Sequence, residues 1–493
     1  MPTVQGELAL RHALRLHPRT LARLDHDSAV SAVAFSPDGT RVATASMDRS
    51  ARVFDAATGT ELARLGHDGP VDGVALSPDG TRVATASEDG SARVFDAAAG
   101  TELARLGHDS GVSAVAFSPD GARVATASED GSARVFDAAT GTELARLDHD
   151  SGVSVVAFSP DGARVATASR DGSARVFDAV TGTELARLGH DGPVDGVAFS
   201  PDGTRVATAS WDGSARVFDA ATGTELARLG HDSAVSAVAF SPDGTQVATV
   251  SGDLVGNRSG SARVFDAATG IELARLDHGG AVSAVAFSLD GTRVATGRGN
   301  FVASGNVIVS LDGSARVFDA ATGTELARLG HDAGVSAVAF SPDGTRVATA
   351  SEDGSARVFD AATGTELARL DHDGPVYAVA FSPDGTRVAT ASRDRSARVF
   401  DAATGTELAR LDHDGPVDGV AFSPDGTRVA TASRDRSARL FEAIPDLLMQ
   451  RAIDAMARPL NSAELRRYLL PANCLHIERW NLRLDHARPK GPE

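Results

Sequence analysis

The sequence predicts an all-β fold, a β-propeller of ten four-stranded repeats. Two observations support this prediction: a unit of 41 residues recurs along most of the chain, and each unit holds four short runs of strand-forming residues. A period of roughly 40–45 residues is typical of one propeller blade. The composition agrees, because 493 residues of which 42% are hydrophobic and 23% charged describe a globular protein with a large core.

A histidine that follows Leu-Asp or Leu-Gly marks the start of each repeat. Most of these histidines lie 41 residues apart, but the spacing is 47 from His231 to His278 and 53 from His278 to His331. Insertions therefore interrupt the sixth and seventh units. The ten histidines are His26, His67, His108, His149, His190, His231, His278, His331, His372 and His413.

Four strands are expected in each unit, and the second unit illustrates them. Residues 71–76, 82–86, 91–95 and 102–106 are short runs rich in Val, Ala and Phe or in Leu, and they are separated by SPDG, SEDG and DAAAG. These spacers have the composition of tight turns. Nineteen of the 20 phenylalanines fall in two columns, nine in the first strand and ten in the third, from Phe54 to Phe441. The sheets must therefore bury Phe against one another, so the repeats are stable only as a stack.

The recurring motifs resemble those of the WD-repeat family of β-propellers. They are a Gly-His pair near the unit start, the SPDG corner, an S-x-D-G-[ST] turn and an aromatic-Asp pair that ends the third strand, and they cover residues 20–441. In the second unit the resemblance implies a buried hydrogen-bonded set of His67, Thr85 and Asp89. Phe95 stands where the family has Trp, so the indole donor is missing and the network is expected to stop at three members. The near-identity of the units is also similar to bacterial propellers amplified from one blade.

The chain ends predict how the ring closes. Each blade takes its outer strand, ELARL, from the start of the next unit, whereas the tenth unit has none and an unclaimed copy, TLARL, occupies residues 20–24. A single ring of ten blades in which this segment completes the tenth is therefore expected, without a free edge. The alternative is a ring of seven or eight blades with extra units packed elsewhere. The expected domains are a short helical tail over 1–18, the propeller over 19–443 and a helical extension over 444–493.

The composition and the repetition exclude several classes of function. A net charge of −18 argues against general nucleic-acid binding, and no apolar run approaches the length needed to span a membrane. Cys474 is the only cysteine, so no disulfide framework is possible and a cytoplasmic location is expected. Ser, His and Asp recur in every unit, which indicates structural support rather than a hydrolytic triad, and the His-Asp pairs are too widely distributed to converge on a metal. No catalytic residue, metal or cofactor is expected.

Functional residues are expected where the units differ from one another. Two columns vary while their neighbours stay fixed, and both are predicted on one face of the ring. The first-strand column, five residues after the His, comprises Ser31, Asp72, Ser113, Ser154, Asp195, Ser236, Ser283, Ser336, Tyr377 and Asp418. The turn column, just before the turn Asp, comprises Met47, Glu88, Glu129, Arg170, Trp211, Glu352, Arg393 and Arg434.

A group of arginines stands out on this variable face. The turns of the ninth, tenth and first units read SRDRS, SRDRS and SMDRS, where most others have Gly after the Asp. In a closed ring these blades are neighbours, which brings together what we call the basic arc: Arg49, Arg393, Arg395, Arg434 and Arg436. The alternative is that these arginines are solvated and paired with local Asp residues. Trp211, Tyr377 and Met47 are candidate contact residues on the same face, together with Asp72, Asp195 and Asp418.

The sequence thus favours a non-enzymatic scaffold, a monomeric disc whose variable face binds a protein or peptide, and the arc favours an acidic partner. Two alternatives remain. RAIDAMARPLNSAELRRYL resembles the helical extension that follows propellers in some bacterial signal-transduction ATPases, which would make the chain a sensor module. An enzyme that uses the central funnel is the other. The insertions, LVGNRSG and the expected hairpin GRGNFVASGNVIVSLDG, offer a further binding surface.

Overall fold

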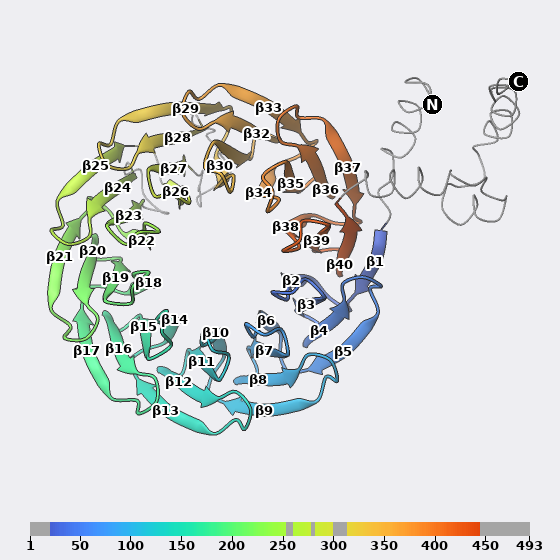
Figure 1. Cartoon of the computed structure of the whole chain (residues 1–493). Helices are drawn as coiled ribbons and strands as arrows, with labels where there is room; N and C mark the ends of the chain where they lie inside the picture. The colour runs from blue at the N-terminus through green and yellow to red at the C-terminus, as the bar shows by residue number, and fades with distance from the viewer. Residues whose placement is uncertain (1–19, 253–259, 278–281, 299–312, 444–493) are drawn as a thin grey trace, which may run out of the picture. The chain divides into compact units, whose positions relative to one another are not determined.

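The computed structural model describes residues 20–252, 260–277, 282–298 and 313–443. Within these ranges the chain forms forty β-strands and no helix. The strands make ten four-stranded antiparallel sheets, which follow one another around a ring (Figure 1). The prediction of a ten-bladed propeller is therefore confirmed, and the alternative of seven or eight blades is wrong. The expected N-terminal helix, the C-terminal helices and both insertions lie outside the described residues.

Each blade has the same strand order, with its first strand nearest the centre of the ring and its fourth strand outermost (Figure 1). The first strands are β2 Val30–Phe35, β6 Val71–Leu76, β10 Val112–Phe117, β14 Val153–Phe158, β18 Val194–Phe199, β22 Val235–Phe240, β26 Val282–Phe287, β30 Val335–Phe340, β34 Val376–Phe381 and β38 Val417–Phe422. The second strands are β3 Arg41–Ser46, β7 Arg82–Ser87, β11 Arg123–Ser128, β15 Arg164–Ser169, β19 Arg205–Ser210, β23 Gln246–Ser251, β27 Arg293–Arg298, β31 Arg346–Ser351, β35 Arg387–Ser392 and β39 Arg428–Ser433.

The outer half of each blade is equally regular. The third strands are β4 Ser50–Asp55, β8 Ser91–Asp96, β12 Ser132–Asp137, β16 Ser173–Asp178, β20 Ser214–Asp219, β24 Ser261–Asp266, β28 Gly313–Asp319, β32 Ser355–Asp360, β36 Ser396–Asp401 and β40 Ser437–Glu442. The fourth strands are β5 Glu61–Gly66, β9 Glu102–Gly107, β13 Glu143–Asp148, β17 Glu184–Gly189, β21 Glu225–Gly230, β25 Glu272–Asp277, β29 Glu325–His331, β33 Glu366–Asp371, β37 Glu407–Asp412 and, for the tenth blade, β1 Thr20–Asp25.

The hydrophobic core lies between the blades rather than within them. At the junction of the first and second blades, Leu65 and the small residues of the first blade pack against Val83 and Phe95 of the second. The third-strand phenylalanines are almost fully buried in this way, Phe95 being 3% exposed, whereas those of the first strand are half-buried. Burying one such side chain contributes about 1.5–3 kcal/mol. Because every junction repeats this packing, each blade depends on both neighbours.

Strand β1 closes the ring by pairing with β40. Arg23 stands opposite Arg439 and Leu24 opposite Ala438, which is the register that Arg64 and Leu65 have with the third strand of the first blade. Leu24 is fully buried in a cluster shared by the tenth and first blades. Closure by the spare N-terminal strand is therefore confirmed.

Candidate functional site

A buried polar network recurs through the ring, on the set that the family resemblance implied. In the second blade His67 Nδ1 lies 3.0 Å from Asp89 Oδ2, and His67 Nε2 lies 2.7 Å from Thr85 Oγ1. The same pairs form in eight of the blades that the structure describes at these positions. The imidazole side chain of His67 is fully buried. It supports the blade and is closed to a substrate.

The network has more than the three members expected from the sequence, so that expectation is wrong. Ser91 donates its hydroxyl to Asp89 Oδ1 at 2.7 Å, and Arg93 Nη2 lies 3.4 Å from Asp89 Oδ2. Arg93 Nη1 also donates to the carbonyl of Gly66 at 2.8 Å, on the outer side of the preceding blade. The arginine of the recurring SAR segment thus adds hydrogen-bond donors to the network. This Arg is invariant among the units, but its place in a strand does not by itself show which groups its guanidinium reaches.

The hydrogen bonds decide the protonation of the pair. Burial lowers the pKa of His67, and the charge of Asp89 offsets this only in part. Burial by itself raises the pKa of Asp89, but bonds from Ser91, from the Asp68 backbone N–H and from His67 outweigh it and hold the pKa well below its usual range. A neutral imidazole that donates from Nδ1 to Asp89 and accepts the Thr85 hydroxyl at Nε2 satisfies all three side chains.

The sixth blade departs from this pattern in the part that the structure describes. His231 Nδ1 lies 2.9 Å from Ser251 Oγ. Arg263 pairs with Asp232 at 2.8 Å. Burial, followed by the charge of Arg263, lowers the pKa of His231 to about 3. Among the described residues, the hydroxyls of Ser251 and Thr249 therefore hold the two ring nitrogens of His231.

The first-strand column sits on a β-bulge in every blade. In the second blade Val71 pairs with Ser87 and Gly73 with Ala86, so Asp72 is the extra, unpaired residue. A bulge re-aims the side chain of the extra residue and releases it from the ladder. The same shift occurs at the other nine first strands. The backbone thus frees this column to vary.

The two variable columns meet within a blade. Trp211 Nε1 donates to Asp195 Oδ2 in the fifth blade. In the tenth blade Arg434 Nε donates to Asp418 Oδ2 at 2.8 Å. In these two blades the two columns therefore present a pair of side chains rather than two independent positions.

The charge of the two column residues differs strongly from one blade to the next. In the second blade partial burial, and then repulsion by Glu88, raise the pKa of Asp72. In the ninth blade Tyr377 of the first-strand column is half-buried, and Arg393 of the turn column is exposed. The hydrogen bond that Arg434 donates to Asp418, and then the charge of that carboxylate, raise the pKa of Arg434.

Some serines of the first-strand column have a structural role. Ser31 Oγ donates to the carbonyl of Val71 in the next blade at 2.9 Å, and Ser113 Oγ does the same to Val153 at 2.9 Å. These hydroxyls join neighbouring blades at the inner side of the ring. Ser is therefore the supporting residue of this column, and Asp or Tyr is the departure from it.

All five arginines of the basic arc are exposed, and they belong to three consecutive blades. Arg434 is paired with Asp418. Within the described ranges the guanidinium groups of the other four make no hydrogen bond or ion pair. The alternative of arginines neutralised by local carboxylates holds for Arg434 alone. Met47 and Trp211 are also exposed on the variable columns, by 49% and 59%.

Three arginines of the arc have an unusual backbone conformation. Arg49, Arg395 and Arg436 have φ values of 67°, 70° and 69°, and they are the only described residues other than glycine with positive φ. The corresponding residue of the second blade is Gly90, whose φ is 80°. A Cβ added to Gly90 would lie 3.0 Å from the carbonyl oxygen of His108. Arginine at this position is therefore strained where glycine is not.

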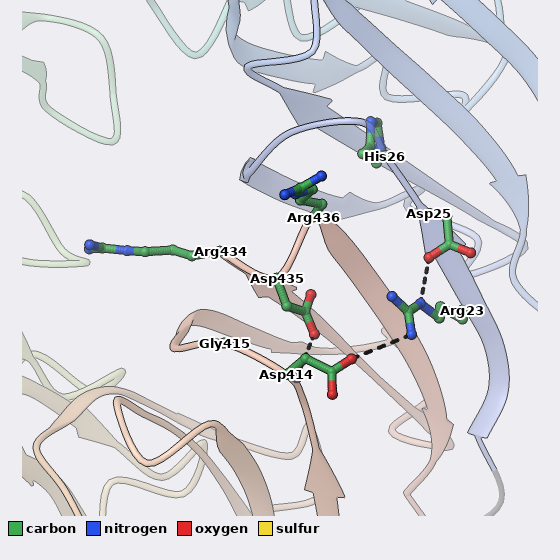
Figure 2. Close-up of a pocket in the computed structure, with 8 residues that line it drawn as sticks. All are labelled: Arg23, Asp25, His26, Asp414, Gly415, Arg434, Asp435 and Arg436. Atoms are coloured by element: carbon green, nitrogen blue, oxygen red, sulfur yellow. Dashed lines mark hydrogen bonds and ion pairs between the residues drawn. The ribbon is translucent and has the colours of Figure 1, made fainter.

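A pocket lies where the two ends of the propeller meet, and we call it the seam pocket (Figure 2). Its lining residues are Arg23, Asp25, His26, Asp414, Gly415, Arg434, Asp435 and Arg436. Arg23 lies between two exposed carboxylates, with its Nε 2.5 Å from Asp25 Oδ1 and its Nη1 3.6 Å from Asp414 Oδ2. Figure 2 shows Arg434 extending away from this cluster. The pocket joins one end of the basic arc to strand β1.

Comparison with known families decides the affiliation. The model of the family described as WD domain, G-beta repeat matches residues 19–55, 59–96, 100–137, 141–178, 182–219, 223–266, 270–319, 323–360, 364–401 and 405–442. This chain belongs to the WD-repeat family. WD-repeat propellers commonly act as scaffolds for protein–protein interactions and are typically not enzymes.

Individual relatives add little to this affiliation. The crystal structure of the computationally designed Ika8 protein aligns with 70% of this chain and 100% of its own, at 30% identity and a TM-score of 0.47. No curated protein matches the WD-repeat chain. In the part of the chain that the structure describes, no three His, Cys, Asp or Glu side chains are grouped as metal ligands. Nor do the described residues include a helix able to cross a membrane.

Proposed function

We propose that this WD-repeat propeller is a non-enzymatic scaffold whose variable face recruits an acidic protein or peptide through the basic arc. The observation that carries the proposal is the strained backbone of Arg49, Arg395 and Arg436. Residues held in a sparsely populated conformation cluster at functional sites, because elsewhere nothing offsets their cost. Five described blades have a glycine with positive φ in the same turn, and the three that have arginine there are neighbours; the glycines are Gly90, Gly131, Gly172, Gly213 and Gly354.

The chemistry of the arc fits carboxylates. Arginine presents a planar fork that binds a carboxylate with two parallel hydrogen bonds. Four of the five guanidinium groups have no partner within the described residues, so their donors are available to a ligand. On a chain with a net charge of −18 a local group of cations also concentrates an acidic partner at one place.

We further expect the protein to be a monomer that has no general affinity for nucleic acids and acts in the cytoplasm. The net charge opposes both self-association and binding to phosphate backbones. A single cysteine suits a reducing compartment. The alternative role as a sensor module depends on residues 444–493, which lie outside the described ranges.

Binding of a synthetic polyglutamate peptide tests the proposal. Reversing Arg395 and Arg436 to Glu is expected to slow association about tenfold and to flatten its dependence on salt, because charged rim groups act mainly on encounter. Arg170→Glu in the fourth blade is the matched control, since Arg170 is equally exposed and lies outside the arc. Equal effects of the control and the double reversal would refute the role of the arc.

A further inference from the structure

The seam pocket is built from both ends of the propeller's chain. Arg23 and His26 come from β1 and the residue that follows it, whereas Asp414, Arg434 and Arg436 come from the loops of the tenth blade (Figure 2). In the other nine blades a short turn of the chain joins the third strand to the fourth. In the tenth blade β40 and β1 are held together only by non-covalent contacts. Opening of the ring at this seam is therefore a local equilibrium of the folded protein.

The contacts across the seam are of the same kind as those elsewhere in the ring. The His26 backbone N–H donates to the Arg436 carbonyl at 2.8 Å, and the His67 N–H donates to the Arg49 carbonyl at the same distance. The pairing of β1 with β40 also repeats the register of the other blades. These contacts therefore give the seam about the strength of an ordinary strand pair, while the covalent link that other blades have is missing.

The arginines on the two sides of the seam, Arg436 and Arg23, can both take part in ligand binding. Arg436 is exposed and has no side-chain partner within the described residues. Arg23 is paired, but its partners Asp25 and Asp414 are 66% and 77% exposed, and ion pairs this exposed contribute little. A carboxylate-rich ligand on Arg436 can therefore engage Arg23 at small cost.

We propose that an acidic peptide bound to the basic arc also engages Arg23 across the seam pocket, and that recognition of the partner thereby holds the ring closed. This inference rests on the proposed function, and it adds that binding and ring closure are coupled. Binding to the arc alone would need only the turns of the ninth, tenth and first blades, whereas the coupling also needs Arg23 of β1 in place.

The expected effect follows from linkage. A ligand that binds only the closed ring multiplies the equilibrium constant for closure by one plus the ratio of free ligand concentration to Kd. When the ligand concentration is a hundred times Kd, this factor is about 100. By reciprocity, loosening the seam weakens binding in proportion to the fraction of closed rings that is lost. Leu24→Ala, which removes buried contacts of β1 without touching the pocket, is therefore expected to lower the affinity for the peptide.

Hydrogen exchange with and without saturating polyglutamate peptide, at constant ionic strength, tests the inference. Amides of β1 and β40 are expected to exchange at least about tenfold more slowly with the peptide, within the limit set by linkage. Strands β12 and β13 of the third blade are the matched control. Strand β13, with the sequence ELARLD, pairs with β12 in the same register in which β1, with the sequence TLARLD, pairs with β40. The residues that flank β13 distinguish its peptides from those of the other blades. Their exchange is expected to be unchanged.

Matched variants identify the residues responsible. Arg23→Gln is expected to abolish the protection of β1 and β40 by the peptide while the ring stays closed. Arg146→Gln is the control, since Arg146 pairs with Asp148 as Arg23 pairs with Asp25. Arg436→Gly, which restores the residue of most other blades, is likewise expected to abolish the protection.

The outcomes separate this inference from the proposed function. If the peptide binds through the arc but leaves β1 and β40 exchange unchanged, the coupling is wrong and the scaffold function stands. If inorganic phosphate at equal ionic strength slows exchange as much as the peptide, the pocket is a small-anion site and the inference is overturned. If the peptide does not bind at all, both the inference and the acidic-partner proposal fail.

Discussion

The three strained arginines predict a variant that is more stable and binds less well. Replacing Arg49, Arg395 and Arg436 by glycine gives the three turns the residue that the second blade has at Gly90. The backbone already has a conformation that glycine adopts freely, with φ between 67° and 70°. The change therefore removes Cβ crowding without requiring any movement of the turn.

The magnitude can be worked out from the structure. A side chain in the left-handed region costs about 1–2 kcal/mol, and at Gly90 the cause is visible, because a Cβ would lie 3.0 Å from the His108 carbonyl oxygen. Glycine returns about 0.5–1 kcal/mol of this through its freedom in the unfolded chain. The net gain is about 0.5–1 kcal/mol per site and about 2 kcal/mol for three sites in separate turns.

The melting temperature converts this gain into an observable. Unfolding entropy of about 2.1 cal/mol/K per residue amounts to about 0.9 kcal/mol/K over a ring that spans residues 20–443. A gain of about 2 kcal/mol then raises Tm by about 2 °C. Calorimetry measures this shift, and titration with polyglutamate measures binding, which is expected to weaken at least about tenfold as the arginine forks are lost.

Opposite signs of the two effects make the test decisive. If stability falls, the arginines are not strained as described, and if binding is unchanged, their strain has no relation to the ligand. Gly90→Arg in the second blade is the matched control. It is expected to lower stability by about 1 kcal/mol and to leave binding to the arc unchanged.

Three further predictions concern the ring as a whole. Deleting residues 1–24 exposes the edge of β40 and is expected to cause self-association or a large fall in Tm, measured by light scattering and calorimetry; an equally stable monomer would contradict closure by β1. His190→Ala is expected to lower the free energy of unfolding by about 1–3 kcal/mol in urea, because Asp212 and Thr208 lose their partner, with peptide binding unchanged; lost binding at unchanged stability would instead make this histidine functional. Acid is expected to destabilise the fold from about pH 6.5 downward, since burial and then the charge of Arg52 lower the pKa of His26 to about 4, below its unfolded value. The unfolded state then binds the proton first, so His26 alone costs about 2 kcal/mol at pH 5, and stability that rises between pH 7 and 5 would refute the neutral, buried imidazole.

Much of the architecture could be read from the sequence because it depends on repetition. The strands of the second unit lie within one residue of the expected ranges, and the unclaimed TLARL segment is the closing strand β1. Period, turn residues and a spare copy of a strand are one-dimensional signals. The His67, Thr85 and Asp89 set was accessible in the same way, through motifs shared with a family.

The parts that the sequence did not disclose depend on where side chains point. Arg93 reads as an ordinary strand residue, and only the hairpin geometry shows that its guanidinium reaches Asp89 four residues earlier. The bulge at Asp72 is equally hidden, because it arises from pairing between two strands and not from either strand alone. For this reason the variable columns could be found by comparing units, but their contact with each other could not.

The near-identity of the blades gives these differences an energetic meaning that a single sequence rarely has. Gly90 and Arg436 occupy the same turn, on nearly the same backbone, within one molecule. The comparison therefore acts as a substitution measured against an internal reference, in which arginine is less favourable than glycine by the strain at positive φ. Selection for stability alone would favour glycine in all such turns. Arginine stands instead in three adjacent turns, next to the seam that lacks a covalent link, and the acidic ligand that we propose would offset its strain by spanning that seam.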